Sequence, residues 1–163
     1  MSSKVKILNL NGVNHNTTDE NSRRAIGDYY EHKLLSIFIN NNINVKYIAE
    51  NNRFSIYDFI IEKDGIKYIV ELKSRLGNIE NHTIELICYN KIQAFKKIVE
   101  KAKSKTKIIF IFNHIETQDN YKFYYYLVDL KTIDDICFLN YDCYDKPTYE
   151  IPTRYLRPLQ EFI

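Results

Sequence analysis

Several features that define whole classes of protein are missing from this sequence. Its three cysteines, Cys88, Cys137 and Cys143, form no CxxC pair, so the sequence indicates neither a zinc site nor a disulfide framework. A signal peptide, a long apolar stretch, internal repeats and linkers are missing too. We therefore expect an intracellular, soluble protein with no membrane partner, in the cytoplasm of a bacterial or virus-infected cell or in a nucleus. A single domain over residues 1–163 is predicted, with its core at about 21–130 and a C-terminal extension at about 131–163.

A strong charge imbalance is missing as well. The net charge is only +2, with a pI of about 8.3, which permits a nucleic-acid partner through a local basic patch but does not by itself predict one. Hydrophobic residues, by contrast, make up 45% of the chain, with 14 tyrosines and 9 phenylalanines. Because a chain of this length can bury about 70% of the surface of its unfolded state, we expect one sizeable core.

The pattern of apolar residues predicts a mixture of helices and strands. A helix is expected at 21–39, because Ile26, Tyr30 and Leu34 recur at four-residue steps and Asp19 or Asn21 can cap its start. A second, amphipathic helix is expected at 90–103. Strands are expected at 4–10, 45–49, 107–112 and 121–128, and polar loops at 74–82 and 114–120. Residues 84–88 are either a strand or the lead-in to the second helix. A short helix or turn is expected at 132–136, and an edge strand or docked extension at 149–158. This order indicates an α/β fold, with a central mixed β-sheet flanked by helices.

The functional prediction depends on one hairpin near the middle of the chain. Two runs of β-branched and aromatic residues flank Asp64-Gly65, which is the strongest short-range signal for a two-residue hairpin turn. Counting outward from that turn pairs Asp58 with Glu71. Lys73 lies two residues beyond Glu71 and therefore projects from the same face of the strand.

The charges of this hairpin are expected in an unfavourable setting. Like charges directly opposite each other destabilise a sheet, and apolar neighbours on both faces indicate that Asp58, Glu71 and Lys73 are buried. Buried charges cost stability unless they are compensated, and a divalent cation is the simplest compensation. Glu31, at the margin of the apolar stripe of the first helix, also needs a partner, and an ordinary salt bridge to a nearby Arg or Lys is one alternative.

Together these residues resemble the motif of the PD-(D/E)xK nuclease superfamily, which includes restriction endonucleases and Holliday junction resolvases. The matching positions are Glu31 on the first helix, Asp58 in the first hairpin strand, and Glu71, Leu72 and Lys73 in the second. The resemblance covers about residues 23–103 and includes the amphipathic helix after the hairpin. Tyr57 stands where the motif has proline, a departure found in many members. The resemblance implies a restriction-endonuclease-like core.

The resemblance also implies an activity, that of a Mg²⁺-dependent endodeoxyribonuclease in which Mn²⁺ can substitute. Its substrate would be DNA, with a structure-specific preference for branched DNA or a nicking action, and small members often act as homodimers. Asp58, Glu71 and the carbonyl of Leu72 would hold the ion, and Glu31 would ligate a second ion or hold a water. Lys73 would orient the attacking water, and we favour positioning over general-base work because nearby carboxylates oppose a lowered lysine pKa.

Four further residues are candidate nucleic-acid contacts near this motif, and for each the alternative is an ordinary solvated loop or helix face. They are Ser74, Arg75, Lys91 and Gln93. We assign no role to His82 or His114.

Two other functions stay open at this point. The first is a catalytically silent nuclease-like module that binds DNA or a protein. The second is an α/β domain unrelated to nucleic acids, in which Glu71 and Lys73 merely form a salt bridge. Intact Asp58, Glu71 and Lys73 argue against a silent module, and the low net charge argues against purely electrostatic DNA binding.

Overall fold

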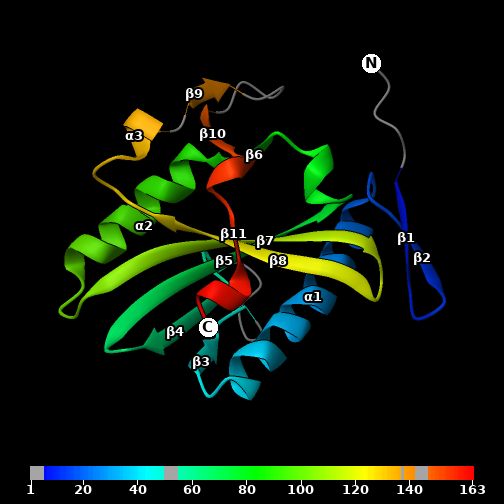
Figure 1. Ribbon diagram of the computed structural model, residues 1–163, viewed down its shortest axis with the longest axis horizontal. Coiled ribbons are helices and arrows are strands. Elements are labelled where there is room, and N and C mark those ends of the chain that lie inside the picture. The colour runs from blue at the N-terminus through cyan, green and yellow to red at the C-terminus, as the bar shows by residue number, and fades with distance from the viewer. Residues whose placement is uncertain (1–5, 50–54, 137, 142–146) are drawn as a thin grey trace.

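A mixed β-sheet forms the centre of the fold (Figure 1). The computed structural model describes residues 6–49, 55–136, 138–141 and 147–163. The six strands lie in the order β11 (Arg157–Pro158), β8 (Asn120–Val128), β7 (Thr106–Thr117), β5 (Ile66–Leu76), β4 (Phe59–Lys63) and β3 (Asn44–Tyr47). The β5–β7 pair is parallel and the other pairs of this sheet are antiparallel. The predicted α/β class with a central mixed sheet is confirmed.

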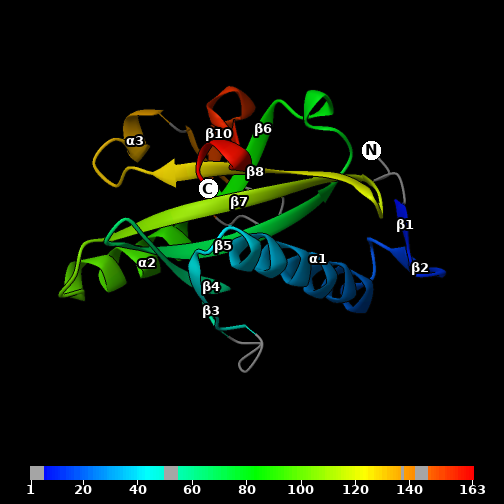
Figure 2. The ribbon, with the colours of Figure 1, turned by 60° about the horizontal axis from the view of Figure 1, so that its bottom comes forward.

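Two long helices cover opposite faces of this sheet. Helix α1 (Glu20–Asn40) lies along one face, as Figure 2 shows, and α2 (Tyr89–Lys101) packs on the other. A three-stranded antiparallel sheet lies on the α2 side, with the order β6 (Ile84–Cys88), β10 (Pro147–Pro152) and β9 (Phe138–Tyr141). The remaining elements are β1 (Ile7–Leu10), β2 (Val13–Asn16), η1 (Ile79–Asn81), α3 (Ile133–Ile136), η2 (Thr153–Tyr155) and η3 (Leu159–Glu161).

The apolar pattern that predicts the two helices also explains how they pack. On one face, α1 buries Ile26, Tyr30, Leu34 and Phe38 against the sheet. On the other, α2 buries Ile92 and Phe95. The N–H of Ser22 donates to the carboxylate of Asp19 at 3.0 Å, so the predicted cap begins α1. Both predicted helices are confirmed to within two residues. None of the described helices is long and apolar enough to cross a membrane.

The predicted hairpin turn is present between β4 and β5. Asp64 and Gly65 have φ values of 52° and 76°, and a two-residue type I′ turn requires positive φ at both positions. The register runs as predicted from the pair next to the turn, Lys63 and Ile66, to the pair of Phe59 and Val70.

The ladder stops one residue before Asp58, so the predicted cross-strand pair of Asp58 and Glu71 is wrong. The N–H of Asp58 donates to the carbonyl of Val70 at 3.0 Å. The carbonyl of Asp58 accepts hydrogen bonds from the N–H groups of Ile48 and Ala49. The backbone therefore leaves the ladder at Asp58, and this side chain comes to a different position along β5.

Two strands are longer than predicted. β5 continues to Leu76 and β7 to Thr117, because their parallel pairing extends as far as Leu76 and Ile115. The first residues of the loops expected at 74–82 and 114–120 therefore belong to the sheet. Residues 84–88 form a strand, and the tail contributes β10 and β11. Cys88 is half-buried, whereas Cys137 and Cys143 lie outside the described residues.

Candidate active site

Charged side chains from both helices and from the hairpin converge where β4 stops pairing with β5. The sequence predicts Glu31, Asp58, Glu71 and Lys73 as one site, and the fold brings these side chains close enough to affect the pKa of their neighbours in the group. Lys91, a candidate DNA contact from the sequence, belongs to the same cluster. The site thus lies beside β5, an interior strand of the central sheet, and receives side chains from both α1 and α2.

Asp58 is fixed by the backbone of the neighbouring strand. Its Oδ2 accepts a hydrogen bond from the N–H of Leu72 at 2.8 Å, which satisfies a donor that β4 leaves free. Burial, and next the charge of Glu31, raise the pKa of Asp58 to about 7, against the Leu72 bond and the charge of Lys91. A carboxyl with this pKa is partly protonated near neutral pH. A metal ion that binds it must therefore displace the proton.

Glu71 is the most deeply buried acid of the cluster, with 6% of its surface exposed. Its Oε1 lies 2.5 Å from Nζ of Lys91 and 3.8 Å from Nζ of Lys73. Burial raises its pKa first, and the charge of Asp58 raises it further, while both lysines act in the opposite direction. Two ammonium groups therefore compensate the charge of this carboxylate.

Glu31 reaches the site from α1. It accepts a hydrogen bond from the hydroxyl of Tyr47 on β3, and burial is the main cause that raises its pKa. The neighbouring arginines of α1 are engaged elsewhere, Arg24 with Glu20 and Arg23 with the carbonyl of Thr17. Tyr47 was missed in the sequence, although the alternation of β3 places it on the same face as Val45.

Lys73 projects from β5 beside Glu71. Burial is the largest effect on this lysine and lowers its pKa, while the charge of Glu71 opposes that change. The lysine is thus held in a poorly solvated position next to a carboxylate, which restricts the orientation of its ammonium group.

The oxygen atoms of this cluster fit a hard divalent cation. In the part of the chain that the structure describes, no three His, Cys, Asp or Glu side chains are arranged as a metal site. Mg²⁺ needs fewer, since one or two carboxylates suffice when waters and phosphate oxygens complete the shell. Asp58 and Glu71 provide two carboxylates. The carbonyl of Leu72 points to the same edge of β5 as its N–H, which Asp58 binds.

The remaining candidates have different surroundings. Arg75 Nε lies 3.4 Å from Oε2 of Glu85, a carboxylate with only 2% of its side chain exposed, and Oε1 of Glu85 lies 2.8 Å from Nε2 of His114. The hydroxyl of Ser74 is buried without a hydrogen-bond partner among the described residues. Gln93 lies on α2, outside the described interactions of the cluster. His114 lies opposite Arg75 in the parallel β5–β7 pair, and no local pattern of the sequence indicates this position.

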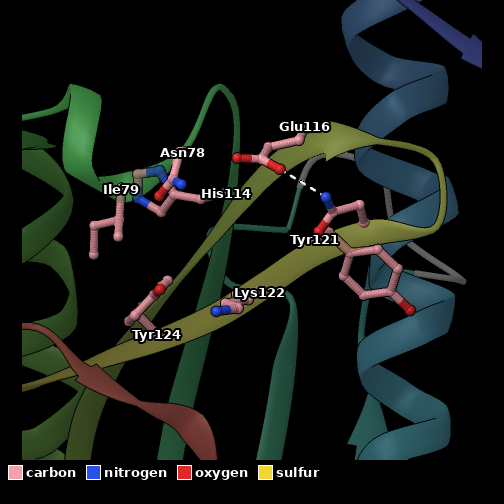
Figure 3. Close-up of a pocket in the computed structure, with 8 residues that line it drawn as sticks. Asn78, Ile79, His114, Glu116, Tyr121, Lys122 and Tyr124 are labelled. Carbon is pink, nitrogen blue, oxygen red and sulfur yellow. Dashed lines mark hydrogen bonds between the residues drawn. The ribbon is translucent and has the colours of Figure 1, made fainter.

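A hollow outside this charged cluster lies near the β7–β8 hairpin, with Glu116 among the side chains in its wall (Figure 3). Its volume is about 80 Å³, and His114, Lys122 and Tyr124 contribute to its wall. Ligand pockets usually measure about 300–1,000 Å³, so this hollow is too small for a substrate. The charged cluster at the end of the hairpin is the better candidate.

Comparison with known proteins gives a likeness of fold. No protein-family model matches the sequence, and no curated protein matches it. Among solved structures, the fold is similar to that of Hjc, a Holliday junction resolvase from the archaeal hyperthermophile Archaeoglobus fulgidus, with a TM-score of 0.50 and 10% sequence identity. The match covers 80% of this chain and 97% of that chain. The chain therefore shares its fold with an archaeal Holliday junction resolvase.

Proposed function

We propose that this protein is a metal-dependent nuclease of the PD-(D/E)xK superfamily that hydrolyses phosphodiester bonds in DNA. The observation that carries the proposal is the buried cluster at the end of the hairpin. Burial and neighbouring acids raise the pKa values of Asp58, Glu71 and Glu31 there, beside a lysine whose pKa burial lowers. Perturbed carboxylates and lysines gathered in one place are typical of catalytic sites.

Each residue of the cluster has a role in this proposal. Asp58, Glu71 and the carbonyl of Leu72 would hold Mg²⁺ or Mn²⁺. The bound ion would polarise the phosphoryl oxygen and neutralise developing charge. Lys73 would orient the attacking water and stabilise negative charge on the phosphate, because Glu71 keeps its ammonium group in place at 3.8 Å. Glu31, held by Tyr47, would accept a hydrogen bond from water on the α1 side or ligate a second ion.

The likeness to a Holliday junction resolvase supports branched DNA as the first substrate to test. A four-way junction needs two strands cut, and one active site of this kind cuts one strand. We therefore propose a homodimer as the working form, with one site for each strand.

A cleavage assay tests the proposal directly. Linear, nicked, flapped, single-stranded and four-way-junction DNA would each be incubated with Mg²⁺, Mn²⁺ or EDTA. Glu71→Gln is the test variant, and Glu62→Gln is its matched control, because Glu62 is an exposed residue of β4 on the same hairpin. We expect metal-dependent cutting by the wild type and the control, and none by Glu71→Gln. Cutting that persists in Glu71→Gln would refute the assignment of the site.

A catalytically silent DNA-binding module is the second candidate, and one contact favours it. The ammonium group of Lys91 lies 2.5 Å from Glu71 Oε1, so it compensates this carboxylate without any metal ion. DNA binding without cutting under all the ionic conditions of the same assay would establish this alternative.

A further inference from the structure

One edge of β5 extends beyond the candidate active site. β4 pairs with β5 only as far as Val70, whereas β7 follows the opposite edge as far as Leu76. Within the described residues, no strand pairs with the first edge over 71–76. Asp58 binds the N–H of Leu72 at the start of this open edge. The ammonium group of Lys6 lies 3.4 Å from the carbonyl of Leu76 at its end.

A groove of about 380 Å³ runs along this open edge, between β5 and the first half of α1. Its size falls within the range of about 300–1,000 Å³ that is usual for ligand pockets. The residues that line it are Lys6, Thr17, Arg23, Ile26, Gly27, Leu72, Lys73, Ser74, Arg75, Leu76 and Ile115.

The charge of the groove has one sign. Among the described residues that line it, four are Lys or Arg and none is Asp or Glu. Two of the four, Lys6 and Arg23, donate to neutral backbone carbonyls, those of Leu76 and Thr17. Neither forms an ion pair within the described part of the chain. Two exposed cations without acidic partners would therefore attract an anion into the groove.

Gly27 leaves the groove open on the α1 side. A side chain at this helix position would meet no atom within 4 Å of its Cβ. Glycine in the middle of a helix costs about 0.5–1 kcal/mol relative to alanine. The helix thus carries an unfavourable residue at a position that lines the groove.

We propose that this groove binds the phosphodiester backbone of the DNA strand that continues beyond the cleaved phosphate. Lys73 belongs both to the groove and to the active site, so a strand bound in one would pass directly into the other. From Leu72 to Leu76 the edge is about 13 Å long at roughly 3.3 Å per residue, which is long enough for more than one phosphate of a strand. The proposal rests on the proposed nuclease function and adds the path of the strand.

The salt dependence of DNA binding tests this path without any need for cleavage. Binding would be measured by fluorescence anisotropy in EDTA, with the wild-type protein and a labelled four-way junction. The test variant is Lys6→Gln/Arg23→Gln. Its matched control, Arg24→Gln/Lys97→Gln, removes the same charge from exposed positions outside the groove. In duplex DNA, each lost phosphate contact reduces the magnitude of the slope of log K against log salt by about 0.9. We expect this magnitude to decrease by about two in the test variant and by less than half a unit in the control.

A second pair of variants adds new side chains to the groove at Gly27. Gly27→Glu places a carboxylate in the groove and Gly27→Ala adds only a methyl group, and neither meets an atom near its Cβ. We expect Gly27→Glu to weaken DNA binding at least tenfold and Gly27→Ala to change it less than twofold. Both variants should melt at or above the wild-type temperature, because each has a higher helix propensity than glycine.

The outcomes separate this inference from the proposed function. If the wild type cleaves DNA but the two double variants have equal salt slopes, the proposed role of the groove is refuted and the nuclease function stands. Equal DNA affinities of the two Gly27 variants would have the same meaning. Failure of the wild type to bind or cut any DNA would overturn both.

Discussion

The pKa of Asp58 leads to a quantitative prediction about stability in the absence of metal. In the folded protein this carboxyl has a pKa of about 7 instead of its ordinary 3.8. The folded state therefore holds the proton more tightly than the unfolded chain. The contribution of Asp58 is most favourable below about pH 4 and is lost as the pH rises through 7.

The size of the effect follows from the difference in pKa. One pKa unit corresponds to about 1.36 kcal/mol, so ionised Asp58 destabilises the fold by at most about 4 kcal/mol at pH 8. Replacing Asp58 by Asn removes this charge and keeps an acceptor for the N–H of Leu72. The difference in pKa already includes the effect of this hydrogen bond. The expected gain is therefore at most about 4 kcal/mol at pH 8 and about 2 kcal/mol at pH 5.

Thermal unfolding in EDTA measures this gain. For a chain of this size, 1 kcal/mol shifts Tm by about 2–4 °C, so the gain in Tm of Asp58→Asn at pH 8 should reach roughly 8–16 °C. The difference should shrink at pH 5, and the variant should not cleave DNA at any pH. A lower Tm at pH 8, or an equal gain at both pH values, would show that like-charge repulsion and burial do not govern this carboxyl.

Three further variants test individual contacts of the site. Lys73→Ala should slow single-turnover cleavage by about 10²–10⁴-fold, the usual contribution of a positioned catalytic group, while calorimetry finds Mg²⁺ affinity almost unchanged. Lys91→Met removes the ammonium group 2.5 Å from Glu71; it should destabilise the metal-free protein by about 1–3 kcal/mol and strengthen Mg²⁺ binding, because a competing cation is gone. Tyr47→Phe removes a hydrogen bond that lowers the pKa of Glu31, so the acidic limb of the cleavage pH profile should move to higher pH.

Each of these expectations has an outcome that contradicts it. Unchanged turnover in Lys73→Ala would remove this lysine from the mechanism. Weaker Mg²⁺ binding in Lys91→Met would mean that Lys91 assists the ion instead of competing with it. An unshifted pH profile in Tyr47→Phe would show that Glu31 does not titrate during catalysis.

The sequence was sufficient to predict the hairpin and the residues that its strands carry. Local chemistry decides these features, since Asp64-Gly65 favours positive φ at both turn positions. The predicted register is confirmed along the paired part of β4 and β5. Where the ladder stops could not be predicted, because a contact distant in the sequence decides it. The carbonyl of Asp58 binds the N–H groups of Ile48 and Ala49, and no local pattern indicates that contact.

Polar residues within strands were the main obstacle to predicting the rest of the site. Ser74, Arg75 and His114 have the composition of a loop, but parallel pairing of β5 with β7 makes them parts of strands. Two of them, Arg75 and His114, contact Glu85, which comes from a different sheet. The pattern of a single sequence carries no information on such pairings between distant segments. The ion pair of Lys91 with Glu71 could not be predicted for the same reason.

The open edge of β5 has a consequence for how this protein avoids aggregation. An unpaired strand edge is a template for pairing with a strand of another molecule, and lysines at the edge are a common protection against it. Lys6 covers the carbonyl of Leu76, and Arg75 and Arg23 stand along the same groove. The cations that would attract a phosphate chain therefore also repel a second copy of this edge, which carries the same charge.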